Sequence, residues 1–254
     1  MIERLLPVEV FAFLLVFCRI GGAVVIMPGF GEAFISPRVR LFIAFVITLV
    51  TAPVVVGTLP AMPDAVGSLV LLIAGEVLVG VFIGTLVRLL LAALATAGTV
   101  IAFVSGLASA LAFNPLLADQ GSLPSAFLTL LGLVLIFVTN LHHLMLLAVF
   151  DSYSLFVPGV APEIGDMAMM VGRTVADSFA LGLQLAAPFM VVAFMFYVLI
   201  GLLARLMPQM QVFFIAIPMQ ILLGFFVFSI VLTSVMLWFL TKFQESLIPF
   251  LAPG

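Results

Sequence analysis

The feature that most constrains this chain is a series of seven apolar runs, each about as long as a bilayer crossing. The hydrocarbon core of a bilayer is about 30 Å thick, and an α-helix crosses it with about 20 residues. The runs are continuous, whereas the strands of a membrane barrel alternate apolar and polar residues. The runs are Val10–Met27, Leu41–Leu59, Leu69–Val87, Leu89–Ala112, Leu123–Phe150, Phe179–Ala204 and Val212–Leu240.

Composition places the chain in the same class. Of its 254 residues, 66% are hydrophobic and 7% are charged, and a soluble domain of this length does not have such a composition. The segment between the fifth and sixth runs, Asp151–Ser178, is too short for a soluble domain and contains Pro158-Gly159, so we expect it to be mainly a loop. We predict an all-α integral membrane protein with six to seven kinked helical segments arranged as hairpins.

The fourth run leaves the number of crossings open. It is rich in Ala, Gly, Thr and Ser, and Asn114-Pro115 follows it, where a helix is hard to continue. Irregular backbone at membrane depth is tolerated only where protein or a water-filled cavity satisfies its amides. This favours six spans with a re-entrant small-residue loop near residues 106–122, whereas the distribution of Lys and Arg between the loops mildly favours seven full crossings.

Glu76 stands out because it lies inside an apolar run. An intramembrane carboxylate is costly, so a neighbouring group must compensate it. Two interpretations of Glu76 are open: a proton or ion site, or the structural partner of a cation such as Arg19. Gly80 and Gly84 follow it with GxxxG spacing, which predicts close packing against another helix.

Asn140, His142 and His143 are further polar residues within the apolar runs. Adjacent histidines point about 100° apart on a helix, so they do not form the pair of ligands that a metal requires. We expect hydrogen-bonded interior residues, with a pH-dependent role as the alternative. The pattern contains no nucleophile with a base and no phosphate loop, and the Lys and Arg residues are scattered. We therefore expect no enzyme activity, no cofactor, no metal and no nucleic-acid partner.

The order of several motifs resembles the FliR/SctT family, the export-gate subunits of flagellar and virulence type III secretion systems. The resemblance is most specific in the last two runs and covers essentially the whole chain. One departure is Thr99, where many members carry a Glu. The motifs are Arg19-Ile20-Gly21-Gly22, "GEVLVGVFIG", "AGTVIAFVSGLASALAFNP", "LHHLMLLAVFDSYSLFVPG", Gly201-Leu202-Leu203-Ala204-Arg205 and Pro208-Gln209, with Pro218 and Gly224 beyond them.

The resemblance implies two functional loops. One is a hairpin loop that faces the cytoplasm and meets an FlhB-like switch protein, with Arg205, Pro208, Gln209 and Gln211. The other is a plug in the pore, where small residues pack tightly yet give way. The plug residues would be Gly106, Leu107, Ala108, Ser109, Ala110, Leu111, Ala112, Phe113, Asn114 and Pro115.

The same resemblance implies a single membrane domain, residues 1–254, in which residues 1–150 are FliP-like and residues 151–254 are FliQ-like. Its partners would be FliP-like and FliQ-like subunits, membrane lipid and unfolded exported proteins in transit. Its place would be the bacterial inner membrane at the flagellar basal body. Two alternatives stay open: a secondary transporter with a site at Arg19, Glu76 and Asn114, and an assembly scaffold without a pore.

Overall fold

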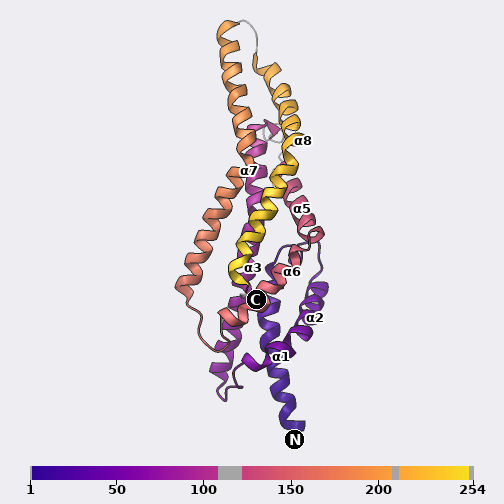
Figure 1. Cartoon of the computed structure of the whole chain (residues 1–254), viewed down its shortest axis with the longest axis vertical. Coiled ribbons are helices and arrows are strands. Elements are labelled where there is room, and N and C mark those ends of the chain that lie inside the picture. The colour runs from indigo at the N-terminus through magenta and orange to yellow at the C-terminus, as the bar shows by residue number, and fades with distance from the viewer. Residues whose placement is uncertain (1, 108–121, 208–211, 252–254) are drawn as a thin grey trace. The chain divides into compact units, whose positions relative to one another are not determined.

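All regular secondary structure in the described part of the chain is helical. The computed structural model describes residues 2–107, 122–207 and 212–251 (Figure 1). The prediction of an all-α membrane protein is confirmed. The α-helices are α1 (Ile2–Ile26), α2 (Pro37–Val55), α3 (Val66–Val104), α5 (Leu123–Val138), α6 (Leu141–Leu155), α7 (Ile164–Leu206) and α8 (Val212–Leu247), with short 3-10 helices at Val56–Thr58 and Ile248–Phe250.

Four helices in the described ranges are long and apolar enough to cross a membrane: α2 with the short 3-10 helix that follows it, α3, α7 and α8. The bent pair α5 and α6 adds a fifth span if the two helices count as one. In α1 the apolar part is shorter, Val10–Ile26. The expected six to seven segments are therefore present as apolar helices, but their boundaries differ from those predicted.

α3 replaces two predicted segments with one continuous helix of 39 residues. The sequence suggested a break at Arg88, because a charge interrupts the apolar run there. Arg88 is exposed, and its guanidinium donates a hydrogen bond to the Ile26 carbonyl at 3.2 Å. A single charged side chain that is exposed and hydrogen-bonded does not end a helix, because arginine itself has high helix propensity.

For α5 and α6 the predicted boundaries are wrong in the opposite sense. The run from Leu123, predicted as one segment, is broken into two helices. The two helices meet at an angle of 77°. Asn140, at the N-cap of α6, has φ +60°, a left-handed conformation that Asn adopts more readily than most residues. The break lies inside a stretch that is apolar on both sides, so the hydrophobic pattern does not reveal it.

α7 begins about four turns earlier than predicted. The sequence assigned residues up to Ser178 to a loop, yet the helix starts at Ile164 and continues for 43 residues. The early part carries Asp166, Arg173 and Asp177, and no charged residue follows until Arg205. Polar residues disfavour a membrane crossing but not a helix, so the charged part extends the apolar span without interrupting it.

The chain divides into two compact units. The first comprises residues 1–90, 137–175 and 244–254, and the second comprises residues 91–136 and 176–243. In the first unit the fully buried side chains include Leu15, Met27, Ile83 and Met145. In the second unit they include Leu94, Leu128, Ile136 and Phe239. Each unit therefore has an apolar core of its own.

Within the second unit, the C-terminal part of α7 and the N-terminal part of α8 lie side by side (Figure 1). The rings of Phe189 on α7 and Phe228 on α8 are 5.9 Å apart. Proline occurs inside both helices, at Pro188 and Pro218, where it removes a backbone hydrogen bond and favours a kink. The sequence predicted this pair as a helical hairpin.

Candidate functional site

A buried ion pair joins two helices of the first unit. Arg19 on α1 donates from Nε to Glu76 Oε2 at 2.6 Å and from Nη2 to Oε1 at 3.1 Å. The arginine is 1% exposed and the glutamate 3%. Both oxygens of the carboxylate are therefore engaged by one guanidinium, the strong two-point geometry of an arginine–carboxylate pair.

A third segment completes the coordination of this guanidinium. Nη1 donates to the Ser152 hydroxyl at 3.2 Å, and Nη2 also donates to the Phe156 carbonyl at 2.9 Å. The guanidinium carbon lies 4.0 Å from the centre of the Tyr153 ring, a cation–π contact. Arg19 thus ties α1 and α3 to the end of α6. This arrangement favours the structural interpretation of Glu76, because one guanidinium engages both of its carboxylate oxygens.

Glycines bring α1 and α3 close enough for this pair to form. A Cβ at Gly80 would overlap the carbonyl oxygen of Arg19, and one at Gly84 would lie 2.8 Å from the carbonyl oxygen of Ala23. A side chain at either position would therefore push the two helices apart. The predicted GxxxG face of α3 meets α1 along the turn that carries Arg19.

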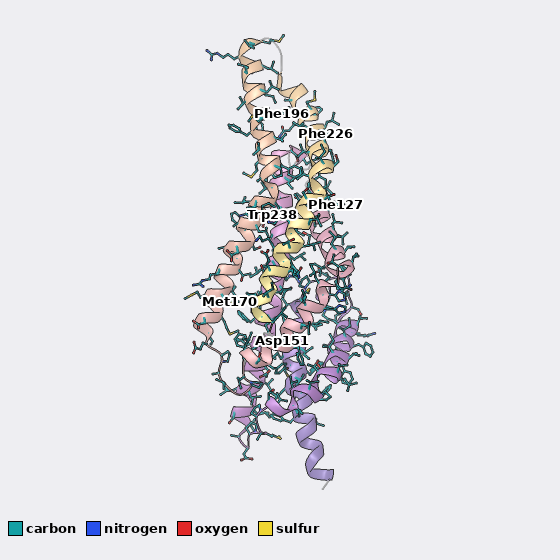
Figure 2. The ribbon with its side chains drawn as sticks, in the orientation of Figure 1. Phe127, Asp151, Met170, Phe196, Phe226 and Trp238 are labelled. Carbon is teal, nitrogen blue, oxygen red and sulfur yellow. The ribbon has the colours of Figure 1, made fainter. Side chains whose placement is uncertain are left out.

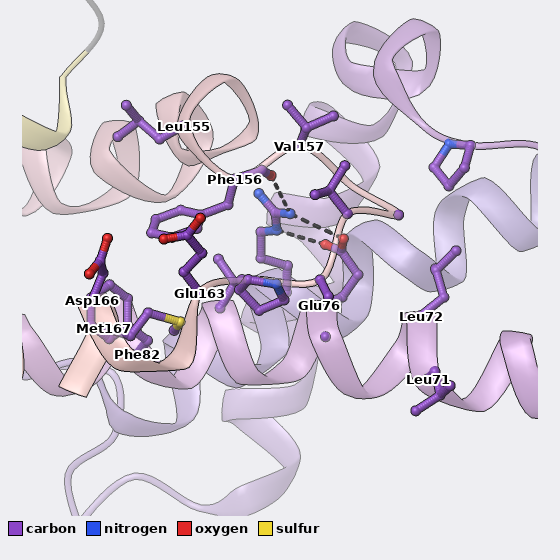
Figure 3. A pocket seen from close by; sticks show the side chains of 18 of the residues that line it. Leu71, Leu72, Glu76, Phe82, Leu155, Phe156, Val157, Glu163, Asp166 and Met167 are labelled. Carbon is purple, nitrogen blue, oxygen red and sulfur yellow. Dashed lines mark hydrogen bonds and ion pairs between the residues drawn. The ribbon is translucent and has the colours of Figure 1, made fainter.

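The ion pair lies at the wall of a pocket of the first unit with a volume of about 1020 Å³ (Figure 3). Most of the lining is apolar, and Figure 3 shows Leu71, Phe82 and Met167 among these side chains. Glu163 and Asp166, at the start of α7, supply two further carboxylates. The pocket has the size of a ligand or peptide site, with few polar groups.

A second polar cluster lies in the other unit, at the C-terminal end of α3. The Gln220 side chain on α8 donates from Nε2 to the Val104 carbonyl at 2.7 Å and to the Tyr197 hydroxyl on α7 at 2.9 Å. Gly224 lies one turn further along α8 and leaves room for Ser105. A Cβ at position 224 would lie 2.7 Å from the Cβ of Ser105. Gln220 therefore joins three helices at the point where α3 ends.

The predicted plug begins just beyond this cluster. Gly106 has φ +74°, a left-handed conformation that favours glycine, so the chain leaves the axis of α3 there. Gly106 and Leu107 belong to the described residues, whereas the other predicted plug residues, 108–115, lie outside them. Of the predicted hairpin loop, Arg205 is exposed at the end of α7, and Pro208, Gln209 and Gln211 also lie outside the described residues.

Asn140 and His143 differ from the sequence prediction, because both are exposed rather than buried. The break between α5 and α6 is the physical reason, since Asn140 lies at the break itself and His143 lies in the first turn of α6. His142 stacks on Phe137 with ring centres 4.9 Å apart, and its Nδ1 has no hydrogen-bond partner among the described residues. In the same ranges, no three His, Cys, Asp or Glu side chains gather as metal ligands.

Sequence reasoning missed three of the residues that complete these clusters. Ser152, Tyr153 and Gln220 are polar or amphipathic side chains within long apolar helices. Serine and tyrosine are common in membrane helices, so they give no signal by themselves. Gln220 could have been noticed, because an amide in an apolar run needs a partner in the same way as a charge.

The fold and the two clusters define a class of protein: an all-helical membrane protein in which the two polar clusters join helices. Comparison with known proteins makes this specific. The model of bacterial export proteins, family 1, matches residues 10–246. This chain belongs to that family, which confirms the resemblance found in the sequence.

Curated relatives carry the name flagellar biosynthetic protein FliR. The protein of Caulobacter vibrioides is 37% identical over 239 residues, covering 94% of this chain and 95% of the relative. The protein of Bacillus subtilis is 29% identical, covering 84% and 83%. The protein of Escherichia coli is 27% identical, covering 78% and 75%. The chain is therefore a membrane component of bacterial protein export, related along most of its length to proteins of flagellum biosynthesis.

Proposed function

We propose that the chain is a structural and gating subunit of the pore through which the flagellar export apparatus passes proteins across the inner membrane. It co-assembles with FliP-like and FliQ-like subunits and contacts an FlhB-like switch protein. Its relatives supply the flagellar context, because they are named flagellar biosynthetic proteins. The structure contributes a reason for co-assembly, which is the apolar surface of α7.

The observation that carries the proposal is that α7 continues well beyond its apolar stretch and still exposes large apolar side chains there. A helix of 43 residues is about 64 Å long, roughly twice the thickness of the hydrocarbon core. Ile164 at one end and Leu206 at the other are each 69% exposed. Lipid chains can cover only about half of this length. We infer that other protein subunits cover the large apolar side chains that are exposed on the charged part of the helix, among them Ile164, Met169 and Val175.

α8 extends the same argument. Large apolar side chains are exposed on it, among them Phe226 and Trp238, which Figure 2 labels. Aromatic side chains of this size dominate the energy of protein interfaces. We infer that the C-terminal residues 151–254 form the FliQ-like part of the subunit, which packs against FliQ-like partners. Residues 1–150 form the FliP-like part.

The gating role is assigned to the loop that follows α3. We propose that residues 106–115 act as a plug. Their small side chains allow the plug to pack tightly, and the plug moves aside when an unfolded protein enters the pore. Gly106 starts this loop with a left-handed turn. The hairpin loop with Arg205 and the following residues is assigned to the cytoplasmic contact with the FlhB-like protein.

The test of co-assembly is purification of the tagged chain in a mild detergent, with native mass determination and identification of every protein recovered. We expect FliP-like and FliQ-like subunits in one particle of defined mass. Recovery of a stable monomer or homodimer would contradict the proposal and would favour the secondary transporter.

A further inference from the structure

The pocket beside the ion pair has a lining that suits a particular kind of ligand. Its wall comes from several parts of the first unit: the loop at Pro60–Pro63, the first half of α3, the end of α6 and the start of α7. The volume of about 1020 Å³ is large enough for several side chains of a partner. Large apolar side chains at its rim, Leu71 and Val160, are 75% and 68% exposed.

The charges of the lining are unbalanced. The guanidinium of Arg19 is neutralised by Glu76, so it offers no positive charge to a ligand. Glu163 and Asp166 are exposed, and neither forms an ion pair with another described residue. The lining therefore carries an excess of two negative charges beside an apolar wall. Such a site complements a ligand that combines apolar groups with a cation.

The position of the pocket along α7 decides between a lipid and a polypeptide. The stretch Phe179–Ala204 has no charged residue and is about 39 Å long, which is enough to cross the hydrocarbon core. Asp166, Arg173 and Asp177 precede it. Charged side chains avoid the hydrocarbon, so the pocket residues of α7 lie in the part of the helix that projects beyond it. Acyl chains have no cation to place beside Glu163 and Asp166 there, whereas a protein segment supplies both apolar side chains and a cation.

We propose that this pocket docks an apolar segment of a partner polypeptide, from which a Lys or Arg side chain meets Glu163 and Asp166. The proposal rests on the assembly described under the proposed function, because it names one contact surface of that assembly. The partner's apolar side chains cover Leu71 and Val160, which are exposed at the rim. Its cation lies at the mouth, where the two carboxylates are accessible.

Gly75 offers a way to fill the pocket without disturbing the fold. It lines the pocket, and a Cβ at this position would meet no heavy atom within 4 Å. Gly75→Leu therefore places a larger side chain in the empty space and removes a helix-weakening glycine at the same time. Gly67→Leu is the matched control, because Gly67 is exposed on the same helix, has equal room and lies outside the lining.

The experiment places the photo-crosslinking residue p-benzoylphenylalanine at position 71 in living cells, in place of Leu71. We expect a crosslink to one peptide of an export-apparatus protein, apolar in sequence and with a Lys or Arg among the residues next to the crosslink. Gly75→Leu abolishes this crosslink and Gly67→Leu preserves it. Glu163→Gln with Asp166→Asn lowers its yield by roughly fivefold to tenfold, the effect of losing two exposed ion pairs.

Several results would overturn the inference: no crosslink from position 71, a crosslink to phospholipid, a crosslinked peptide without a basic residue, or an unchanged yield in Gly75→Leu. Purification of the same cells for FliP-like and FliQ-like subunits is read separately. If those subunits are recovered while position 71 gives no crosslink, the pocket inference fails and the proposed function stands. If position 71 crosslinks as expected but the subunits do not co-purify, the proposed function fails.

Discussion

At the scale of single residues, the interior of the first unit depends on Arg19. Removing a charge from water costs free energy, and interactions with partners offset this cost only when their geometry and hydrogen bonding are good. Here the guanidinium has both carboxylate oxygens of Glu76, the Ser152 hydroxyl, the Phe156 carbonyl and the Tyr153 ring. Loss of the carboxylate alone would leave the arginine buried without a counter-charge.

We therefore expect Glu76→Gln to destabilise the protein by about 3–5 kcal/mol, the usual effect of breaking a buried ion pair. The measurement is the thermal midpoint of the detergent-purified complex, together with its yield. Replacing both partners, Arg19→Met with Glu76→Leu, restores most of the stability, because neither charge then remains buried.

The result that would contradict this expectation is a Glu76→Gln complex with normal yield and midpoint but no protein export. Glu76 would then serve transport rather than structure. Asp177→Asn is the matched control, since it also removes one carboxylate, and that carboxylate is exposed and lies outside the pocket lining.

The sequence identified Arg19 and Glu76 because a charge inside an apolar run is conspicuous. It could not identify their pairing with certainty, because 57 residues separate them and only the helix contact brings them together. Ser152 and Tyr153 could not be found at all, since their role depends on where α6 ends relative to Arg19.

At the scale of helices, close packing of α1 and α3 sets the geometry of the ion pair. Gly80 permits the approach, whereas Gly21, on the other helix, has no heavy atom within 4 Å of the position of a Cβ. The two glycines therefore form a matched pair for testing. Both lie in helices, but only one is at the contact.

We expect Gly80→Leu to destabilise the protein by about 1–3 kcal/mol or more, because an added side chain at a tight contact forces the backbones apart. Gly21→Leu leaves stability unchanged within error. Thermal midpoints of the two purified variants give the comparison. Equal midpoints would show that α1 and α3 do not pack as the structure has them.

In the second unit, the hydrogen bonds of the Gln220 amide lead to a similar prediction about stability. Gln220→Leu leaves the Val104 carbonyl without its side-chain donor, and we expect a loss of about 1–3 kcal/mol. Tyr197→Phe keeps that donor and removes only the contact to the phenol, so its loss is smaller. The reverse order of thermal midpoints would argue against the role of Gln220 at the end of α3.

Helix existence could be predicted from the sequence, but helix boundaries could not. An apolar run indicates how many residues avoid water, but it looks the same whether the helix is straight or broken. α3 continues through Arg88, and the chain bends at Asn140, because local contacts and a single left-handed residue decide these points. α7 extends beyond its apolar stretch because a charged segment can remain helical outside the bilayer.

At the scale of the whole molecule, α7 exposes apolar side chains beyond the length that the hydrocarbon core covers. α7 is about 64 Å long and carries exposed apolar side chains at both ends. The protein therefore offers surfaces for the membrane partners that its membership of an export family implies. The central claim is that, in the assembly, its loop after α3 closes the pore.

The most direct test of this claim is the ionic conductance of the assembled complex in planar bilayers, with and without residues 106–113. The wild-type complex is expected to be nearly closed. Deletion of the loop segment is expected to open a steady leak while the particle mass, apart from the deleted residues, stays the same. An assembled deletion complex with the same conductance as the wild type would contradict the gating role.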